Sequence, residues 1–309
     1  AGFEDEKQLQ LGLRSLALYP QFLEELRTDT GIQIPFDSHG TLFAGLNRDD
    51  REWLQRLYSY KKKTGCPAKW LSGEEAREVE PLLSPRVICG MMLADETQIN
   101  NRMLIEALKT AFISQGGMLS EGIGVQAILI EQGKVLGIQL EIKQAMLASC
   151  VINASGAWSN QLYTSSTPIK PIKGQIFTMK MKPDYTLSRV IRTPRVYLAP
   201  KKDGTLRVGA TSEDAGFDEE ITAGAALDLL KNAWEVFPAI EQFEIQEMMA
   251  GLRPVTTNNL PLIGETSVKG LFQAIGHGRS GVLLTPYTAY LISDLIQNKG
   301  FSHVDYLQW

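Results

Sequence analysis

The stretch GHGRSGVLLTP, residues 276–286, decides the fold of this chain. The apolar run GLFQAI at 270–275 precedes it and predicts a strand, and the apolar residues from Val282 onward predict a helix. A strand, a glycine-bearing turn and a helix start in direct succession suit an anion, because the unpaired N–H groups and positive dipole end of the helix face the turn. Glycines there allow close backbone approach. By itself, the loop is equally compatible with a tight turn that binds nothing.

Two other stretches carry related signals. VINASGAWSN (151–160) is a predicted buried strand that ends in the small residues ASG at 154–156. Small residues at the carboxyl end of a strand suit the ligand crevice of an open α/β sheet, although they also permit close helix packing. AGLRPVTTNNLPLIG (250–264) places Arg253 directly after a predicted strand. A guanidinium there is a candidate carboxylate clamp, with a surface ion pair as the alternative.

Composition and charge exclude several classes of protein. The 309 residues are 44% hydrophobic and 21% charged, which is typical of one large or two ordinary globular domains. The net charge of −4 provides no electrostatic case for binding nucleic acid or an anionic membrane, and no apolar stretch approaches the ~20 residues of a membrane span. The three cysteines are widely spaced and the three histidines are scattered, which predicts a reducing, cytoplasmic compartment and no metal site.

The order of predicted elements indicates α/β structure at both ends of the chain and an antiparallel block inside it, and therefore two interleaved domains. Helices are predicted at 5–28, 47–64, 72–79, from Asn100 or Asn101 to Gly116, and at 222–236. Strands are predicted at 40–46, 87–94, 124–130, 135–142, 146–154, 173–180, 189–199, 205–211 and 243–252. Pro20 is expected to bend or break the first helix.

Taken together, four stretches resemble the FAD-dependent amino-acid oxidases of the D-amino-acid oxidase superfamily, most closely the glycine oxidase branch that includes the thiamine-pathway enzyme. They are VINASGAWS, VYLAPKKDGTLRVGAT, GLRP with its following PLIG, and GHGRSGVLLTPYTAYLISDLI. The resemblance covers residues 5–298 and implies a Rossmann-like FAD/NAD(P)-binding domain with an inserted substrate domain on an antiparallel sheet. The FAD-binding domain would comprise 1–30, 100–165 and 250–309, and the substrate-binding domain 31–99 and 166–249.

The resemblance also assigns site residues. Arg253 and Tyr197 match the positions that hold the substrate carboxylate, and Arg279 lies at a substrate-contact position. The implied cofactor-binding residues are Val125 at the adenine end, Ala154, Ser155 and Gly156 beside the cofactor, and His277, Gly278, Arg279, Ser280, Gly281, Val282 and Leu283 in the flavin loop. The helix that begins near Gly281 would direct its N-terminus at the pyrimidine end of the flavin, where the reduced ring gains negative charge.

The implied reaction is oxidation of the C–N bond of glycine, sarcosine or a D-amino acid. Hydride passes from Cα to the flavin, the imine hydrolyses to an oxo-acid, and dioxygen is reduced to hydrogen peroxide. The segment VTTNNLPLIG after GLRP contains no cysteine, so the FAD is expected to be non-covalent. Alternatives are a D-amino-acid dehydrogenase that passes electrons to a quinone or carrier, and a cofactor-free fragment or binding subunit. The protein could assemble as a homo-oligomer.

One departure from the family pattern concerns the nucleotide-binding unit. The family opens with a strand, a G-x-G-x-x-G turn, a helix and a strand ending in an acid, which together bind the ADP half of FAD. This sequence shows no such unit at its start, and the resemblance begins roughly 45 residues into the pattern. The chain could be a fragment, could receive these strands from another chain, or could have lost the cofactor. We expect the first; the last is the least expected, because a sheet without its central strand exposes apolar edges.

Overall fold

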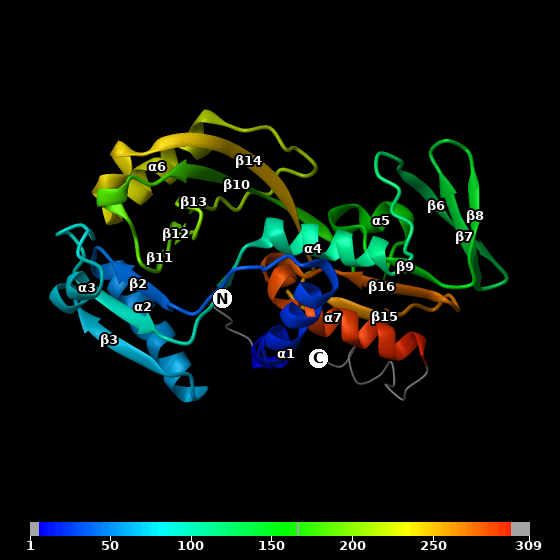
Figure 1. Ribbon diagram of the computed structural model, residues 1–309, viewed down its shortest axis with the longest axis horizontal. Coiled ribbons are helices and arrows are strands. Elements are labelled where there is room, and N and C mark those ends of the chain that lie inside the picture. Colours follow the sequence, from blue (N-terminus) through cyan, green and yellow to red (C-terminus); the bar gives the residue numbers. More distant parts are fainter. Residues whose placement is uncertain (1–5, 166, 298–309) are drawn as a thin grey trace.

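The computed structural model describes residues 6–165 and 167–297 of the chain (Figure 1). It is an α/β structure in which a large mixed sheet and a small sheet lie side by side, joined by long strands. The α-helices are α1 (Glu6–Thr30), α2 (Arg48–Lys63), α3 (Gly73–Val79), α4 (Asn101–Ser114), α5 (Ser159–Leu162), α6 (Ala223–Val236) and α7 (Gly281–Ile296). None of the described helices is long and apolar enough to cross a membrane.

The large sheet has eight strands, in the order β14-β10-β13-β12-β11-β2-β4-β3. In chain order they are β2 (Thr41–Gly45), β3 (Ala68–Ser72), β4 (Cys89–Leu93), β10 (Lys170–Lys180), β11 (Val190–Arg192), β12 (Tyr197–Pro200), β13 (Thr205–Gly209) and β14 (Glu244–Val255). All neighbours are antiparallel except β11 and β2, which run parallel and bring residues about 150 positions apart into register.

The two faces of the large sheet have different residues because side chains alternate along a strand. One face packs against α3 and α6 in an apolar core that includes Leu42, Ile191, Leu198, Val208 and Phe237. The opposite face carries the intervening residues, and α2 covers only the part of it near β2 and β4.

The small sheet has the order β15-β16-β9, formed by β15 (Leu262–Glu265), β16 (Leu271–Ile275) and β9 (Val151–Asn153). β9 and β16 are parallel, so their carboxyl ends meet at one edge of the sheet. Helices α1 and α7 cover one face in an apolar core that includes Leu11, Ile263, Phe272, Leu284 and Leu291. The long β14 reaches from the large sheet to this edge, where Val255 bridges to His277.

Two smaller pairings complete the fold. The strands β6 (Val125–Glu131), β7 (Lys134–Leu140) and β8 (Ala145–Leu147) form an antiparallel meander at the far end of the molecule from the large sheet (Figure 1). The strands β1 (Phe36–Asp37) and β5 (Gln98–Ile99) form a short ribbon beside the large sheet.

The caps confirm the helix starts that the sequence predicts. Ser72 and Glu75 form a reciprocal capping box at the start of α3, and the Asn100 side chain accepts from the Met103 N–H at the start of α4. Pro20 does not break the first helix, because α1 continues through it. A helix tolerates a proline in its interior where packing of the flanking turns compensates for the lost hydrogen bond.

Two runs that the sequence predicts as single strands are each divided between two strands in the structure. The run 146–154 forms the end of β8 and, after a break, β9, which belongs to another sheet. The run 189–199 forms β11 and β12, which pair with each other across a turn where the Thr193 hydroxyl accepts from the Val196 N–H. The run 146–154 is largely apolar, which hid its break, whereas polar residues and Pro194 interrupt the run 189–199 at the turn. The two-domain division stays a prediction, and the ends of its first domain, 1–5 and 298–309, lie outside the described residues.

Candidate active site

Arg253 lies on β14, where strand geometry and two neighbouring carbonyls hold its side chain. Its Nη1 donates to the Thr211 carbonyl at 3.0 Å and lies 3.5 Å from the Lys173 carbonyl oxygen. Gly174 on the adjacent β10 makes room for the guanidinium, since a Cβ there would lie 2.2 Å from Arg253 Nη2. Burial lowers the pKa of Arg253, yet a guanidinium stays charged at physiological pH. The result is a positioned, half-buried cation.

Tyr197 lies on β12 and reaches across β13. Its register partner is Gly209, and a Cβ at that position would lie 2.7 Å from the Tyr197 hydroxyl oxygen. Burial raises the pKa of Tyr197, while the charges of Arg253 and Arg192 act in the opposite direction. The phenol is therefore protonated at neutral pH and can donate a hydrogen bond.

Arg253, Tyr197 and Arg279, the three residues expected to bind substrate, line one cavity of about 120 Å³. We call it the arginine cavity; Arg192, Arg195 and Thr211 also line it. No Asp or Glu of the described chain is among its lining residues. Arg195 forms a bidentate pair with the buried Asp50, at 3.2 and 3.0 Å. The remaining guanidinium groups make this cavity suited to an anion.

Arg192 is a residue of this cavity that the sequence analysis missed. It follows two apolar residues in a short strand and has no local motif around it. Its five-residue spacing from Tyr197 places it in register with Tyr197 only because β11 and β12 form a hairpin. That hairpin was hidden within a run predicted as one strand.

The loop after β16 and the end of β9 form a second cavity, of about 460 Å³. We call it the glycine cavity; its lining includes Ala154, Gly156, His277, Gly278 and Gly281. Gly156 and Gly278 have φ values of +57° and +54°, a conformation that glycine adopts without strain. A Cβ at Gly156 would meet no atom within 4 Å, so the backbone there is open to the cavity. These residues meet because β9 and β16 are parallel.

His277 lines the glycine cavity with an uncharged side chain. Its Nε2 lies 3.0 Å from the Thr288 hydroxyl oxygen on α7, and burial lowers its pKa to about 4. An uncharged imidazole leaves the start of α7 as the main electrostatic feature on this side, with its positive dipole end at Gly281.

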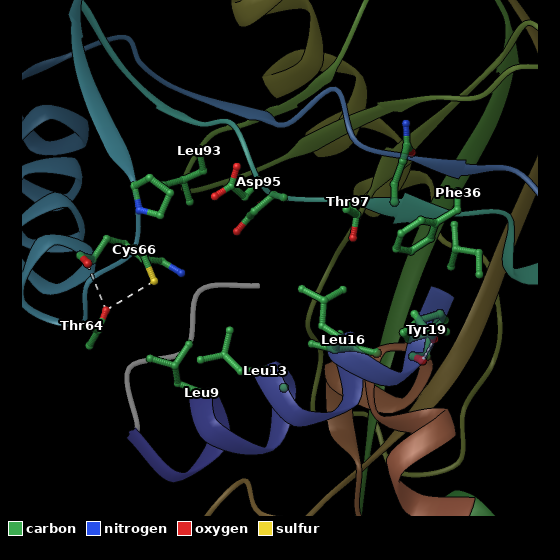
Figure 2. Close-up of a pocket in the computed structure, with 18 of the residues that line it drawn as sticks. Leu9, Leu13, Leu16, Tyr19, Phe36, Thr64, Cys66, Leu93, Asp95 and Thr97 are labelled. Atoms are coloured by element: carbon green, nitrogen blue, oxygen red, sulfur yellow. Dashed lines mark hydrogen bonds between the residues drawn. The ribbon is translucent and has the colours of Figure 1, made fainter. Parts of the chain in front are cut away.

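A third cavity, of about 520 Å³, lies between α1 and the connection from β4 to β5 (Figure 2). We call it the α1 cavity. Leu9, Leu13 and Leu16 form its apolar wall, and Asp95 and Thr97 lie opposite (Figure 2). The Tyr19 hydroxyl donates to the Val282 carbonyl and so ties α1 to the start of α7. Arg279 lines both this cavity and the arginine cavity, which makes the two neighbours.

The structure distributes the expected cofactor-binding residues over several places. Ala154, Gly156, His277, Gly278 and Gly281 line the glycine cavity, while Arg279, Val282 and Leu283 line the α1 cavity. The Ser155 hydroxyl donates to Asn153 Oδ1 at 2.6 Å, and the Ser280 N–H donates to the His277 carbonyl, so both stabilise turns. Val125 pairs with Leu140 in the meander and lines none of the three cavities. The roles of all these residues stay predictions.

The residues that line the glycine and α1 cavities are chemically suited to a flavin. The two cavities lie on either side of the start of α7: Gly281 lines one, and Val282 and Leu283 line the other. Open backbone at Gly156 leaves room for a flat ring or a phosphate chain close to the main chain. The apolar side chains of both cavities suit an aromatic ring system.

Comparison with known proteins places the chain among flavoenzymes. Residues 1–295 match the FAD dependent oxidoreductase (DAO) family. A bifunctional ThiO/ThiG protein of Trichormus variabilis is 33% identical over 295 residues, covering 94% of this chain and 44% of the relative. The glycine oxidase of Geobacillus kaustophilus is 34% identical over 295 residues, covering 94% of this chain and 78% of the relative. The chain thus spans less than half the length of the bifunctional relative.

The fold agrees with these sequence matches. The crystal structure of glycine oxidase from Bacillus cereus ATCC 14579 superposes with a TM-score of 0.92 at 29% identity, covering 99% of this chain and 85% of that one. This agreement confirms the α/β fold class and the family resemblance expected from the four sequence stretches. The chain belongs to the FAD-dependent oxidoreductase family of the D-amino-acid oxidase type.

Proposed function

We propose that this protein is an FAD-dependent oxidase that oxidises the C–N bond of a small amino acid and produces hydrogen peroxide. The observation that carries the proposal is the arginine cavity, where Arg253, Tyr197 and Arg279 converge without any carboxylate side chain in the lining. Its position next to cavities that fit a flavin supports the same reaction, as do relatives named glycine oxidase.

In this proposal Arg253 and Tyr197 bind and orient the substrate carboxylate. One N–H of Arg253 is occupied by the Thr211 carbonyl, which leaves the outer edge of the guanidinium for a bidentate contact. The protonated Tyr197 hydroxyl donates a further hydrogen bond. Two such contacts restrict the substrate to one orientation of its Cα–H bond, which is the main catalytic contribution available to a protein of this kind.

The cofactor in this proposal is non-covalent FAD. Gly156, Gly278 and the first turn of α7 would hold it through backbone N–H groups, and Val282 and Leu283 would pack against its ring. FAD, when bound, supplies the acceptor for the hydride that leaves the substrate Cα. Arg279 lies between the flavin-fitting cavity and the arginine cavity, where its charge stabilises anions on either side.

The cell location and assembly are also proposals. Cys66, Cys89 and Cys150 are all free thiols, which supports the cytoplasm as the compartment. The expected partners are the amino acid and dioxygen, with a homo-oligomer as the proposed assembly.

The test is an activity assay on the protein purified with its flavin. Glycine, sarcosine and D-alanine are added with and without air, and peroxide is measured with a coupled peroxidase. We expect anaerobic bleaching of the flavin band and one peroxide per amine consumed in air. A flavin that the amine reduces, that forms no peroxide in air and that a quinone reoxidises would indicate a dehydrogenase. A flavin that no amino acid reduces would contradict amine oxidation.

A further inference from the structure

We infer that the substrate carries two anionic groups, a dicarboxylic amino acid or an N-carboxymethyl amino acid, and that Arg192 binds the second carboxylate. This inference rests on the proposed amino-acid oxidation and names its substrate class. The starting observation is that the arginine cavity is lined by more positive charge than one carboxylate requires.

The first step concerns which arginines are available. Within the described part of the chain, Arg192, Arg253 and Arg279 take part in no salt bridge, whereas Arg195 is neutralised by Asp50 at 3.0 Å. Three guanidinium groups therefore line a cavity that holds no acid. Arg192 and Arg253 are partly buried and Arg279 is exposed, and a cavity lined by three cations and by no acid is suited to an anionic ligand.

The second step concerns the face of the sheet from which the Arg192 side chain projects. Arg192 and Tyr197 are register partners on the antiparallel strands β11 and β12, and partners of this kind project from the same face of a sheet. On its other side Arg192 is in register with Phe43, and its guanidinium lies 5.7 Å from the centre of that ring. This cation–π contact holds the guanidinium over the Phe43 ring, and Arg192 lines the arginine cavity together with Tyr197.

The third step concerns the nearest acid. Glu96 is the carboxylate whose charge interacts with Arg192, but it interacts also with Lys61 and with the Thr41 hydroxyl. Glu96 lines the α1 cavity and not the arginine cavity. Arg192 and Tyr197 therefore line the arginine cavity together, without Glu96 in its lining.

The fourth step assigns the charges. The α-carboxylate of the substrate occupies Arg253 and Tyr197, and Arg279 faces the start of α7 and the flavin-fitting cavity. Arg192 remains, on the far side of Tyr197 from Arg253. A second carboxylate on the substrate side chain or on the substrate nitrogen meets this guanidinium, whereas glycine, sarcosine and D-alanine have no group to offer it.

The kinetic test uses the flavin-loaded protein with glycine, D-alanine, D-aspartate, D-glutamate and iminodiacetate. We expect kcat/KM for at least one of the three dicarboxylic amines to exceed that for glycine and D-alanine by at least tenfold. Arg192→Gln should lower that value at least ten times more than it lowers the value for glycine. Arg48→Gln, an exposed arginine on α2, is the matched control and should preserve the preference. Equal or better use of glycine by the wild type would overturn the inference.

A binding measurement separates this inference from the proposed reaction. Calorimetry on the same protein compares malonate with acetate, and we expect malonate to bind at least tenfold more tightly through Arg192. If malonate shows this advantage and no amine reduces the flavin, the two-anion site holds and the oxidase proposal fails. If glycine reduces the flavin and malonate binds no better than acetate, the oxidase proposal holds and the two-anion site fails.

Discussion

The arginine cavity and the glycine cavity are lined by different kinds of groups. The first is made of charged side chains that strand register brings together, such as Arg192 and Tyr197 on one hairpin. The second is made of places where side chains are missing, at Gly156 and Gly278, so that the backbone itself is exposed. In the proposed function, the residues that recognise the substrate charge and those that accommodate the cofactor therefore line different cavities. The difference predicts that substitutions in one region leave the function of the other intact.

The largest expected effect is loss of the carboxylate clamp. Arg253→Ala should lower kcat/KM for the amino acid by about 100- to 1000-fold, chiefly through KM, because a charged hydrogen-bonded pair contributes about 2–5 kcal/mol. The flavin content of the purified protein should stay that of the wild type, and Arg253→Lys should recover part of the loss. Unchanged kinetics would remove Arg253 from the site, and loss of flavin would break the separation of the two cavities.

The next largest effect tests the glycine cavity. Gly156→Ala places a methyl group in the open space of the cavity and should raise the Kd for FAD at least tenfold, which a flavin fluorescence titration measures. Gly133→Ala in the β6–β7 turn is the matched control, because its φ is also positive at +75° and its Cβ also meets nothing. Both variants should lose about 1–2 kcal/mol of stability from backbone strain. Equal FAD affinity in the two variants would contradict the assignment of the cavity.

A third prediction uses the neutral His277. Its folded pKa of about 4 lies below the ordinary value of 6.5, so the unfolded chain takes up the proton first as pH falls. The free energy of unfolding should therefore decrease by about 1–2 kcal/mol between pH 7 and pH 5. Urea unfolding at the two pH values measures it, and His277→Gln should lack this component. An identical pH dependence in that variant would show that His277 is not buried as a neutral group.

The smallest expected effect belongs to Tyr197. Tyr197→Phe removes one neutral donor and should raise KM by about five- to tenfold, since such a hydrogen bond contributes about 1 kcal/mol. Burial raises the pKa of this phenol, so in the wild type its protonation should impose no change on KM up to pH 9. Flavin binding should be unaffected. A KM that rises between pH 7 and pH 9 in the wild type but not in Tyr197→Phe would indicate that the phenol ionises.

Sequence patterns were informative where a short segment controls its own structure. The caps at Ser72 and Asn100 and the strand-turn-helix around GHGRSG follow from hydrogen bonds within a few residues. The position of Arg253 after a predicted strand made it a candidate, the family resemblance added Tyr197 and Arg279, and the structure brings all three to one cavity. Val125 was expected at the cofactor, but its strand lies in the meander away from the three cavities, and its role stays untested.

The sequence by itself therefore determined the family, the local elements and a set of residues suited to anion binding, because these depend on residue type and near-neighbour spacing. The tertiary structure alone decided that Arg192 belongs beside Tyr197, that Arg195 is neutralised by Asp50, and that the flavin loop has a different cavity on each side of α7. These facts depend on strands paired across more than a hundred residues, such as β2 with β11. Such pairings are selected by burial over the whole sheet and leave no mark in the local pattern.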